Sequence, residues 1–341
     1  MPFSSGWVGA LSYNPERKAH QFRYCSSSLG LCLSTEEWFF YGSPEEELEL
    51  HHFLSFERPQ KTRIRPQESI HSSMSSEEYC DAIEKTKQEI AKGNVYQINL
   101  SYQLSGFAIE NPLILWWELC HRNPARHAYY WQTETEIIIC NSPELFLRIK
   151  DGTIESCPIK GTNPSIVHIN DYQELWLSEK EESELTMIVD MMRNDLAKIT
   201  IPHSVFVENR KIRRCGDLLH TEQRVLGRLS EECSISDVFN ACFPPASVTG
   251  APKISALKLI EQLEKHERNW YTGSLGFVDD RGHSEWNVCI RSIVIEEGLA
   301  SIFIGAGIVY DSDPQKEWLE TQAKAQALLN VLADVERVNM E

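Results

Sequence analysis

Strand-like and helix-like segments are grouped along this chain rather than strictly alternating, and this order constrains the fold more than any other feature. Short apolar runs and runs that alternate with period two predict strands. They lie at 7–13, 36–42, 95–104, 136–140, 145–149, 271–278, 285–295 and 300–309. A doubly wound parallel sheet needs a helix after nearly every strand, so the grouping favours a layered α+β architecture.

Four segments have the period of an amphipathic helix. They are 75–92, about 171–199, 253–265, and the segment from Asp313 onward. Ser75 and Glu78 form a capping box, and Asp313 followed by Pro314 is typical of a helix start. Apolar stripes mark the second segment at Leu185, Ile188, Met192, Leu196 and Ile199, and the third at Ile254, Leu257, Ile260 and Leu263.

Two further local patterns complete the expected organisation. Residues 57–76 are polar and carry prolines, which makes them the best candidate for a linker. The runs 136–140 and 145–149, followed by the Asp151-Gly152 turn, predict hairpin-like β structure.

Composition excludes several classes of protein. With 341 residues, 42% apolar residues and nine tryptophans, the chain can bury a sizeable core. Its net charge of −17 disfavours nucleic acid and anionic lipid as partners. Ten scattered cysteines without a C-x-x-C pair, and no apolar run of about 18 residues, predict reduced thiols and no membrane span. We therefore expect a cytoplasmic protein.

Two predicted helices begin with a pair of carboxylates on the face that continues as the apolar stripe. Glu181 and Glu184 precede Leu185, and Glu317 and Glu320 precede a stripe at Leu328 and Val331 that also carries Lys324. If the pairs converge, four carboxylates need a cation, and an oxygen-only donor set suits Mg²⁺. Glu184 and Glu320 are the expected ligands, with Glu181 and Glu317 nearby. The alternative is two solvated acidic helix starts that complement the helix dipoles.

Several positions could bind an anion. Arg291 lies within the predicted strand 285–295, where a partly buried arginine usually has an anionic partner. Gly305 and Gly307 allow a ligand to approach the backbone closely, and Thr249 lies just before a helix start. Lys160, in the segment CPIKGT, is an isolated amine among small and apolar neighbours, and a plain surface turn is the alternative there.

Taken together, these motifs resemble the chorismate-utilising enzymes, which include anthranilate synthase component I, aminodeoxychorismate synthase component I, isochorismate synthase and salicylate synthase. The matching stretches are NVYQINLS, SPELFLRI, PIKGT, ESELTMIVDMMRNDLAKI, FPPASVTGAPK, YTGSLGFV, CIRSIVI and GAGIVYDSDPQKEWLET followed by QAKA. They cover about residues 94–333. The resemblance implies one domain over 1–341, with a shortened N-terminal part at 1–70, two facing antiparallel sheets, and helices outside.

The resemblance also assigns roles to individual residues. It implies that Glu184 and Glu320 bind Mg²⁺ with Glu181 and Glu317 as their second carboxylates, and that the metal binds the ring carboxylate. Glu144 would be the general acid/base facing the C4 hydroxyl. The implied substrate-binding residues are Gly161, Thr162, His220, Thr249, Tyr271, Arg291, Gly305 and Lys324.

Two positions distinguish the reactions of this family. Gln97 stands where the water-adding enzymes carry a lysine, so water addition is disfavoured. PIKGT is similar to aminodeoxychorismate synthases, whereas anthranilate synthases resemble PIAGT, and Lys160 is then the implied nucleophile that attacks C2 before ammonia enters at C4. A nucleophilic lysine must be a neutral amine. The implied product is 4-amino-4-deoxychorismate, a precursor of para-aminobenzoate and folate.

No cysteine lies in a G-x-C-x-G nucleophile motif, so we expect ammonia from a separate glutamine amidotransferase. Three alternatives stay open. The chain could be an anthranilate synthase component I, which Lys160 disfavours, or a non-catalytic chorismate-binding subunit. It could also use Lys160 as a Schiff-base lysine unrelated to chorismate, which leaves the paired carboxylates without a role.

Overall fold

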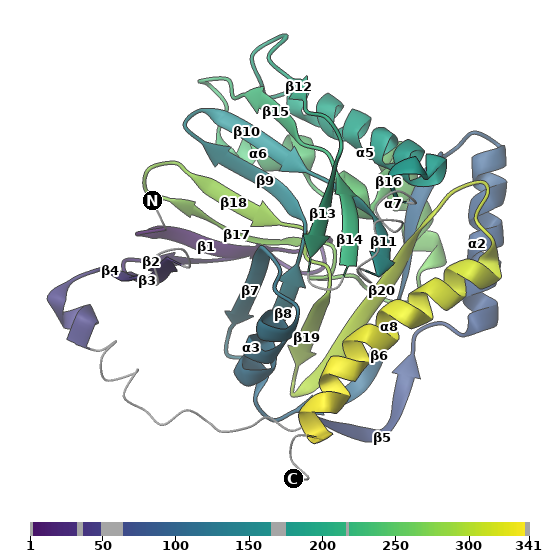
Figure 1. Cartoon of the computed structure of the whole chain (residues 1–341), viewed down its shortest axis with the longest axis horizontal. Helices are drawn as coiled ribbons and strands as arrows, with labels where there is room; N and C mark the ends of the chain where they lie inside the picture. The colour runs from purple at the N-terminus through teal and green to yellow at the C-terminus, as the bar shows by residue number, and fades with distance from the viewer. Residues whose placement is uncertain (1–2, 33–36, 49–63, 165–174, 216–217, 338–341) are drawn as a thin grey trace.

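The computed structural model describes residues 3–32, 37–48, 64–164, 175–215 and 218–337. An eight-stranded and a seven-stranded antiparallel sheet form its body, and helices lie on their outer sides (Figure 1). The expected α+β class, with two large antiparallel sheets and outer helices, is confirmed.

The eight-stranded sheet has the order β12 (Phe206–Val207), β15 (Val225–Arg228), β10 (Thr153–Cys157), β9 (Leu145–Lys150), β18 (Ser284–Asn287), β17 (Ser274–Asp279), β1 (Gly6–Leu11) and β2 (Gln21–Cys25). The seven-stranded sheet has the order β16 (Gly250–Ala251), β6 (Gln97–Ile109), β20 (Leu299–Ile308), β19 (Ser292–Glu296), β8 (Glu136–Ser142) and β7 (His127–Gln132), with β5 (Ile64–Ser72) also paired to β6.

Two smaller sheets were not anticipated. A three-stranded sheet of β11 (Ile159–Pro164), β14 (Leu218–Glu222) and β13 (Lys211–Cys215) lies between the large sheets in Figure 1. The strands β3 (Ser28–Cys32) and β4 (Glu37–Tyr41) form a separate hairpin. The strand β11 of this three-stranded sheet carries Lys160.

The helices are α2 (Ser76–Ala91), α3 (Pro112–Arg122), α5 (Glu179–Ala197), α6 (Ile235–Cys242), α7 (Lys253–Leu263) and α8 (Pro314–Arg337), together with the short 3-10 helix η1 (Ala246–Val248). The capping box of Ser75 and Glu78 is present at α2. Lys316 N–H donates to Asp313 Oδ1 at 2.9 Å, so Asp313 caps α8. Both predicted helix starts are therefore confirmed.

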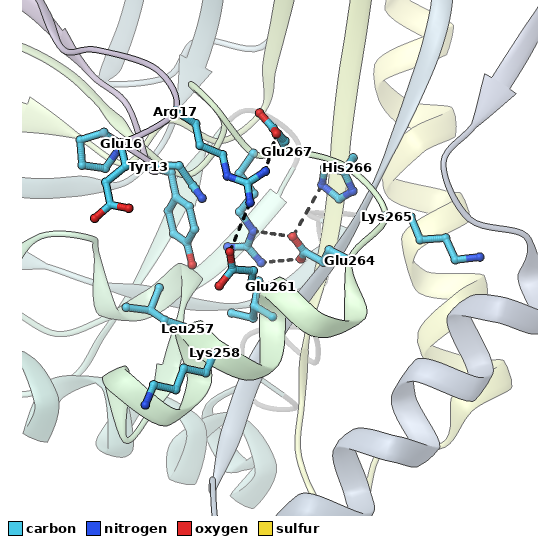
Figure 2. A pocket seen from close by; sticks show the side chains of 14 residues that line it. Tyr13, Glu16, Arg17, Leu257, Lys258, Glu261, Glu264, Lys265, His266 and Glu267 are labelled. Carbon is cyan, nitrogen blue, oxygen red and sulfur yellow. Dashed lines mark hydrogen bonds and ion pairs between the residues drawn. The ribbon is translucent and has the colours of Figure 1, made fainter.

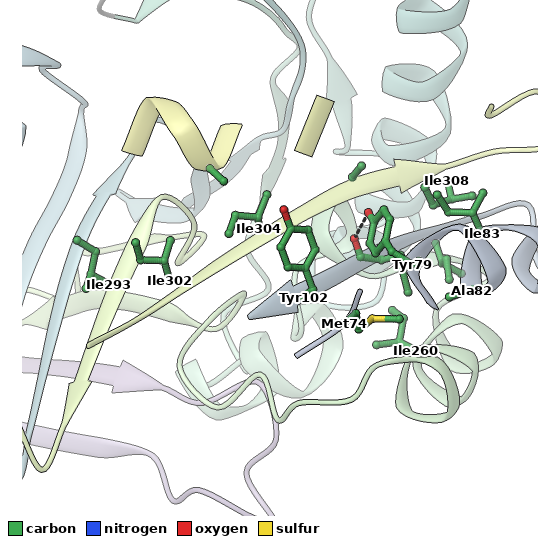
Figure 3. Close-up of a cluster of buried hydrophobic side chains, with 14 of the residues drawn as sticks. Met74, Tyr79, Ala82, Ile83, Tyr102, Ile260, Ile293, Ile302, Ile304 and Ile308 are labelled. Carbon is green, nitrogen blue, oxygen red and sulfur yellow. Dashed lines mark hydrogen bonds between the residues drawn. The ribbon is translucent and has the colours of Figure 1, made fainter. Parts of the chain in front are cut away.

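One face of β20 belongs to the hydrophobic core beneath α2 and α8. Ile302, Ile304, Ala306 and Ile308 join Tyr79 of α2 in this core cluster (Figure 3). The alternate residues Phe303, Gly305 and Gly307 therefore face the opposite side of the strand, toward the space between the large sheets. The alternation of large apolar residues with glycine gives this strand one packed face and one open face.

The stripe predicted on α5 is confirmed, because its five apolar residues are all buried in a second cluster against the eight-stranded sheet. The predicted start at about residue 171 falls outside the described residues. The described helix begins at Glu179, because the Ser178 hydroxyl accepts from Glu181 N–H at 3.3 Å and caps it there. On α7, Ile254 is 72% exposed, whereas Ala256 and Ile260 are buried. The predicted α7 stripe was thus wrong at Ile254.

The predicted linker was wrong over Ile64–Ser72, which is strand β5. Among the described residues, this strand pairs with β6 alone and so lies at the edge of its sheet, where Pro66 is tolerated because an edge residue need not donate to a neighbour. The rest of the linker up to residue 63 lies outside the described residues.

The hairpin expected for 136–140 and 145–149 was also wrong. The strand β8 pairs with β7 and β19 in one large sheet, whereas β9 pairs with β10 and β18 in the other. Only β9 and β10 form the hairpin at Asp151-Gly152. The predicted strand 285–295 is likewise divided into β18 and β19, so Arg291 lies between the sheets and not within a strand.

Among the described residues, no helix is long and apolar enough to cross a membrane.

Candidate active site

Two chain crossovers bring the large sheets together at one point. The first runs from β8 to β9 and carries Glu144, and the second runs from β18 to β19 and carries Arg291. Val288 N–H donates to Glu144 O at 3.1 Å, and Asn141 N–H donates to Arg291 O at 3.2 Å. The two crossovers are therefore hydrogen-bonded to each other, which places Glu144 and Arg291 side by side in the fold.

The fully buried Asn287 braces this junction. Its Oδ1 accepts from Leu275 N–H at 2.8 Å, and its Nδ2 donates to His127 O at 2.8 Å. These bonds connect a strand of the eight-stranded sheet to β7 of the seven-stranded sheet. Arg291 itself has a φ of 50°, a conformation that is uncommon for a residue other than glycine. The bend in the chain thus determines where the guanidinium can point.

The open face of β20 meets three polar side chains at Gly307. A methyl group built on Gly307 would lie 2.7 Å from Gln97 Nε2 and 3.1 Å from Lys160 Nζ. Glu184 Oε2 would lie 3.4 Å from the same methyl group. Lys160 Nζ and Glu184 Oε2 are 3.5 Å apart. Residues from β6, β11 and α5 therefore converge over one glycine that has no side chain to displace them.

A second group lies over Gly305. A methyl group built there would be 2.9 Å from the Tyr271 hydroxyl and 3.1 Å from Asn99 Nδ2. Lys324 Nζ of α8 donates to Gly305 O at 3.3 Å and pairs with Glu320 Oε1 at 2.8 Å. Burial raises the pKa of Tyr271 to about 12, so its hydroxyl stays protonated and can donate near neutral pH.

His220 connects the lysine-bearing strand to Arg291. Its Nδ1 lies 2.6 Å from Gly161 O, and its Nε2 lies 2.9 Å from Arg291 Nη2. The carbonyl can only accept and the guanidinium can only donate, so Nδ1 carries the proton and Nε2 accepts. Burial, assisted by the positive charge of Arg291, lowers the pKa of His220 to about 4. His220 is thus neutral near pH 7 and orients Arg291.

Glu144 is buried at the junction. Burial raises the pKa of its carboxyl to about 7, although a hydrogen bond with Ser247 and the positive charges of Lys160 and Arg291 act in the opposite direction. A carboxyl with this pKa is partly protonated near neutral pH and can both donate and accept a proton. These are the properties required of a general acid/base.

The remaining substrate-binding candidates differ in what they contact. Gly161 has a φ of 70°, and a methyl group on it would lie 3.2 Å from Glu181 Oε2. The Thr249 hydroxyl donates to Pro245 O at 3.1 Å within its own turn. The side chain of Thr162 lies outside the described part of the chain. Gly161 therefore adjoins a carboxylate of α5.

The four carboxylates predicted to bind a metal occupy different environments. Glu184 is buried and adjoins Lys160, whereas the Glu320 side chain is 51% exposed and pairs with Lys324. Glu317 is buried and accepts from Ser312 Oγ at 2.8 Å. Leu328 and Val331 were predicted to continue the helix face of Glu317 and Glu320, but their side chains lie outside the described residues.

Within the described ranges, no group of three or more His, Cys, Asp or Glu side chains is arranged to hold a metal ion. The donor set nevertheless fits the chemistry of Mg²⁺, which takes oxygen ligands, keeps several waters and commonly uses only one or two carboxylates. Glu184 and Glu320 each have a lysine as the present counter-ion. A divalent cation would supply the same positive charge.

Sequence reasoning missed Asn99, Ser247 and Asn287. Asn99 could have been found, because it is two residues after Gln97 in a predicted strand and must share its face. Ser247 and Asn287 lie in irregular segments that periodicity does not describe. Their positions depend on the junction between the sheets.

Residues 5–330 match the family described as chorismate binding enzyme. The chain is 36% identical over 275 residues to "Anthranilate synthase component 1" of Aquifex aeolicus, covering 79% of this chain and 56% of that protein. It is 32% identical over 367 residues to "Aminodeoxychorismate synthase component 1" of Bacillus subtilis, covering 97% of this chain and 77% of that protein. The chain spans little more than half the length of several anthranilate synthase relatives.

Among solved structures, the fold is similar to anthranilate synthase component I from Streptococcus pneumoniae. The TM-score is 0.86 at 25% sequence identity, and the match covers 96% of this chain and 81% of that one. The similarity extends over both large sheets and their junction.

The raised pKa of Glu144 predicts a specific pH dependence of stability. The folded state holds the proton of the Glu144 carboxyl more tightly than the unfolded state does. The contribution of this proton to folding stability is therefore complete below pH 4.5 and is lost as pH rises to about 7. Glu144→Gln removes the titration. Between pH 4.5 and 7.5, the free energy of unfolding of the Glu144→Gln variant should rise by about 3 kcal/mol relative to that of the wild type. Urea denaturation at each pH measures this difference.

Glu232→Gln, at an exposed position, is the matched control and should leave the pH profile unchanged. Parallel profiles for the wild type and Glu144→Gln would show that Glu144 titrates normally.

Proposed function

Because this chain belongs to the chorismate-binding enzyme family, we propose that it aminates chorismate at C4 to form 4-amino-4-deoxychorismate. The observation that carries the proposal is the convergence of Gln97 and Lys160 over Gly307. An amide stands where the water-adding relatives use a lysine, and an amine enters the same space from β11. The site therefore offers a nucleophilic nitrogen in place of a base for water.

Local charge supports a dianionic substrate. Arg291 lies at the junction, Lys324 borders Gly305 of β20, and bound Mg²⁺ would add further positive charge. These local charges would attract a dianion although the whole protein has a net charge of −17. Arg291, held by neutral His220, is suited to one carboxylate, and the Gly161 region with α5 is suited to the other.

The proposed reaction has two displacement steps. The neutral amine of Lys160 attacks C2 while both ring double bonds shift and the C4–O bond breaks. Glu144 gives its proton to the departing hydroxyl, which leaves as water. Ammonia then adds at C4, both double bonds shift back, and the C2–N bond breaks to release Lys160. A proton lost from the new ammonium group returns to Glu144, so that chorismate and ammonia give product and water.

We propose Mg²⁺ as the cofactor, held by Glu184 and Glu320 with Glu181 and Glu317 close by. Bound Mg²⁺ would supply positive charge to the ring carboxylate and orient it. Lys160 and Lys324 would then be released from the two carboxylates they now neutralise. For Lys160 this release is also the condition for acting as a nucleophile, because an ammonium group cannot attack.

We propose that the ammonia comes from a separate glutamine amidotransferase chain. The relatives named component 1 are consistent with a second component, and no cysteine in the sequence lies in a G-x-C-x-G nucleophile motif. A second candidate function is ammonia addition at C2. It is favoured by the higher identity to the Aquifex aeolicus anthranilate synthase component. Lys160 disfavours it.

Product analysis with chorismate, Mg²⁺ and ammonium is the direct test of this function. We expect 4-amino-4-deoxychorismate from ammonium and no turnover with glutamine alone, followed by chromatography and mass spectrometry. Formation of anthranilate, isochorismate or salicylate would assign the chain to another reaction of the family. Turnover with glutamine alone would contradict the separate amidotransferase.

Lys160→Ala should lower the rate of product formation by at least about 100-fold, because it removes the nucleophile. Lys160→Arg should be equally inactive, since a guanidinium group stays protonated. Mass spectrometry of the wild-type protein with chorismate and Mg²⁺ but no ammonia should find an adduct on Lys160. A wild-type rate in Lys160→Ala, with no adduct in the wild type, would reduce Lys160 to an electrostatic contact.

Glu184→Gln should abolish Mg²⁺-dependent activity while the fold persists, because the loss of one ligand charge weakens the metal site. Differential scanning fluorimetry provides an independent readout. Mg²⁺ should raise the melting temperature of the wild type but not that of the variant. The substitution Glu232→Gln at an exposed position is again the control. Full wild-type activity in excess chelator would show that the reaction does not require the metal.

A further inference from the structure

We propose that Asn99 is a further substrate-binding residue whose side-chain amide donates a hydrogen bond to the carboxylate of the enolpyruvyl group. The inference rests on the proposed function, and it concerns the subsite formed by Tyr271, Arg291 and Gly305. Asn99 would add a neutral donor to that subsite beside the Tyr271 hydroxyl.

The placement of Asn99 follows from strand register. Asn99 is directly opposite Gly307 in the pairing of β6 with β20, so its side chain lies on the open face. The side chain extends diagonally over Gly305, where its Nδ2 would be 3.1 Å from an added methyl group. Gln97 occupies the neighbouring position over Gly307. The two amides thus serve two different parts of the site.

The amide nitrogen of Asn99 needs an acceptor that the described protein does not provide. Nδ2 is buried and has no hydrogen-bond partner among the described residues. The Tyr271 hydroxyl is close enough for the Asn99 side chain to lower the pKa of that hydroxyl, but the pair does not meet hydrogen-bonding geometry. Leaving a buried donor unsatisfied is unfavourable. A ligand oxygen placed over Gly305 would satisfy it.

The backbone of Asn99 is fixed on both sides. Its N–H donates to Thr249 O at 2.7 Å, and its carbonyl accepts from Arg268 Nη2 at 2.6 Å. Arg268 is buried and also donates to Val248 O at 2.7 Å. The amide is therefore pre-positioned and would lose little conformational freedom when a ligand binds.

The support for Arg268 comes from a buried ion pair with Glu264 of the α7 C-terminus, at 2.6 Å. Glu264 Oε1 also accepts from Ser101 N–H at 2.8 Å, so the same carboxylate holds β6 two residues beyond Asn99. Glu264 and the ion-paired Arg17 both line a cavity of about 490 Å³ (Figure 2).

The chemistry of the subsite selects an anionic oxygen. The Tyr271 hydroxyl and Asn99 Nδ2 both offer donors over Gly305, and Arg291 adds a positive charge from the junction. A carboxylate accepts several hydrogen bonds at once and matches such a set of donors. A ring carbon or a hydroxyl group would leave at least one of these donors unsatisfied.

Two small probe molecules distinguish the subsites of the two substrate carboxylates. Pyruvate has a carboxylate beside an sp² carbon, as the enolpyruvyl group has, and benzoate has a ring carboxylate. Binding of each to the full chain would be measured by ligand-observed NMR, with chorismate measured by calorimetry without ammonium. The variants are Asn99→Ala, Asn99→Asp and the exposed control Asn194→Ala.

Asn99→Ala should weaken the binding of pyruvate and of chorismate by about 10-fold, because one charge-assisted hydrogen bond is lost. The affinity for benzoate should be unchanged. Asn99→Asp should lower the affinities for pyruvate and chorismate further, because the new carboxylate repels the carboxylate of the ligand. In steady-state assays, KM for chorismate should rise with little change in kcat, since the bond is made equally in the ground and transition states. The control Asn194→Ala should have the affinities and kinetic parameters of the wild type.

Unchanged pyruvate affinity in Asn99→Ala would overturn the inference. Equal losses for pyruvate and benzoate would also overturn it, because they would make Asn99 a structural residue. Failure of the wild type to bind chorismate at all would instead overturn the proposed function, and the inference with it.

Discussion

The hydrogen bonds between the two chain crossovers are the constraint on which the rest of this structure depends. They turn four strands into one continuous ribbon, in which β8 with β19 and β18 with β9 are paired on either side of a bend. The bend brings a carboxyl from one crossover next to a guanidinium from the other. Without it, the large sheets would be separate layers and Glu144 and Arg291 would have no shared environment.

Electrostatics in the site follow from this geometry. Burial at the bend raises the pKa of Glu144 and lowers that of His220, in each case toward the neutral form. The charged groups that remain include Arg291 and two lysines, of which Lys160 pairs with Glu184 and Lys324 pairs with Glu320. Glu144 adds one proton that is available for transfer. The same groups would be much less effective on an exposed surface.

Much of this arrangement could be predicted from the sequence, and the limits are physical. Capping patterns located the helix starts at Ser75 and Asp313, because a cap depends on local hydrogen bonds. Periodicity located the buried stripe of α5, because the stripe depends on one apolar face. It failed where a strand changes sheets, since a bend between sheets does not interrupt the alternation. Arg291 was therefore assigned to a strand interior. The edge strand β5 was missed because its one partner gives it little apolar character.

The open edge of β20 has a consequence for the behaviour of the protein in solution. The strand β19 pairs with β20 only as far as Ile302, so the described segment from Phe303 to Ile308 has a strand neighbour on one side only. Exposed strand edges can add strands from other molecules and lead to aggregation. Here α8 crosses the edge and Lys324 binds the Gly305 carbonyl. The helix thus keeps a backbone edge accessible to a small ligand while blocking it to another polypeptide.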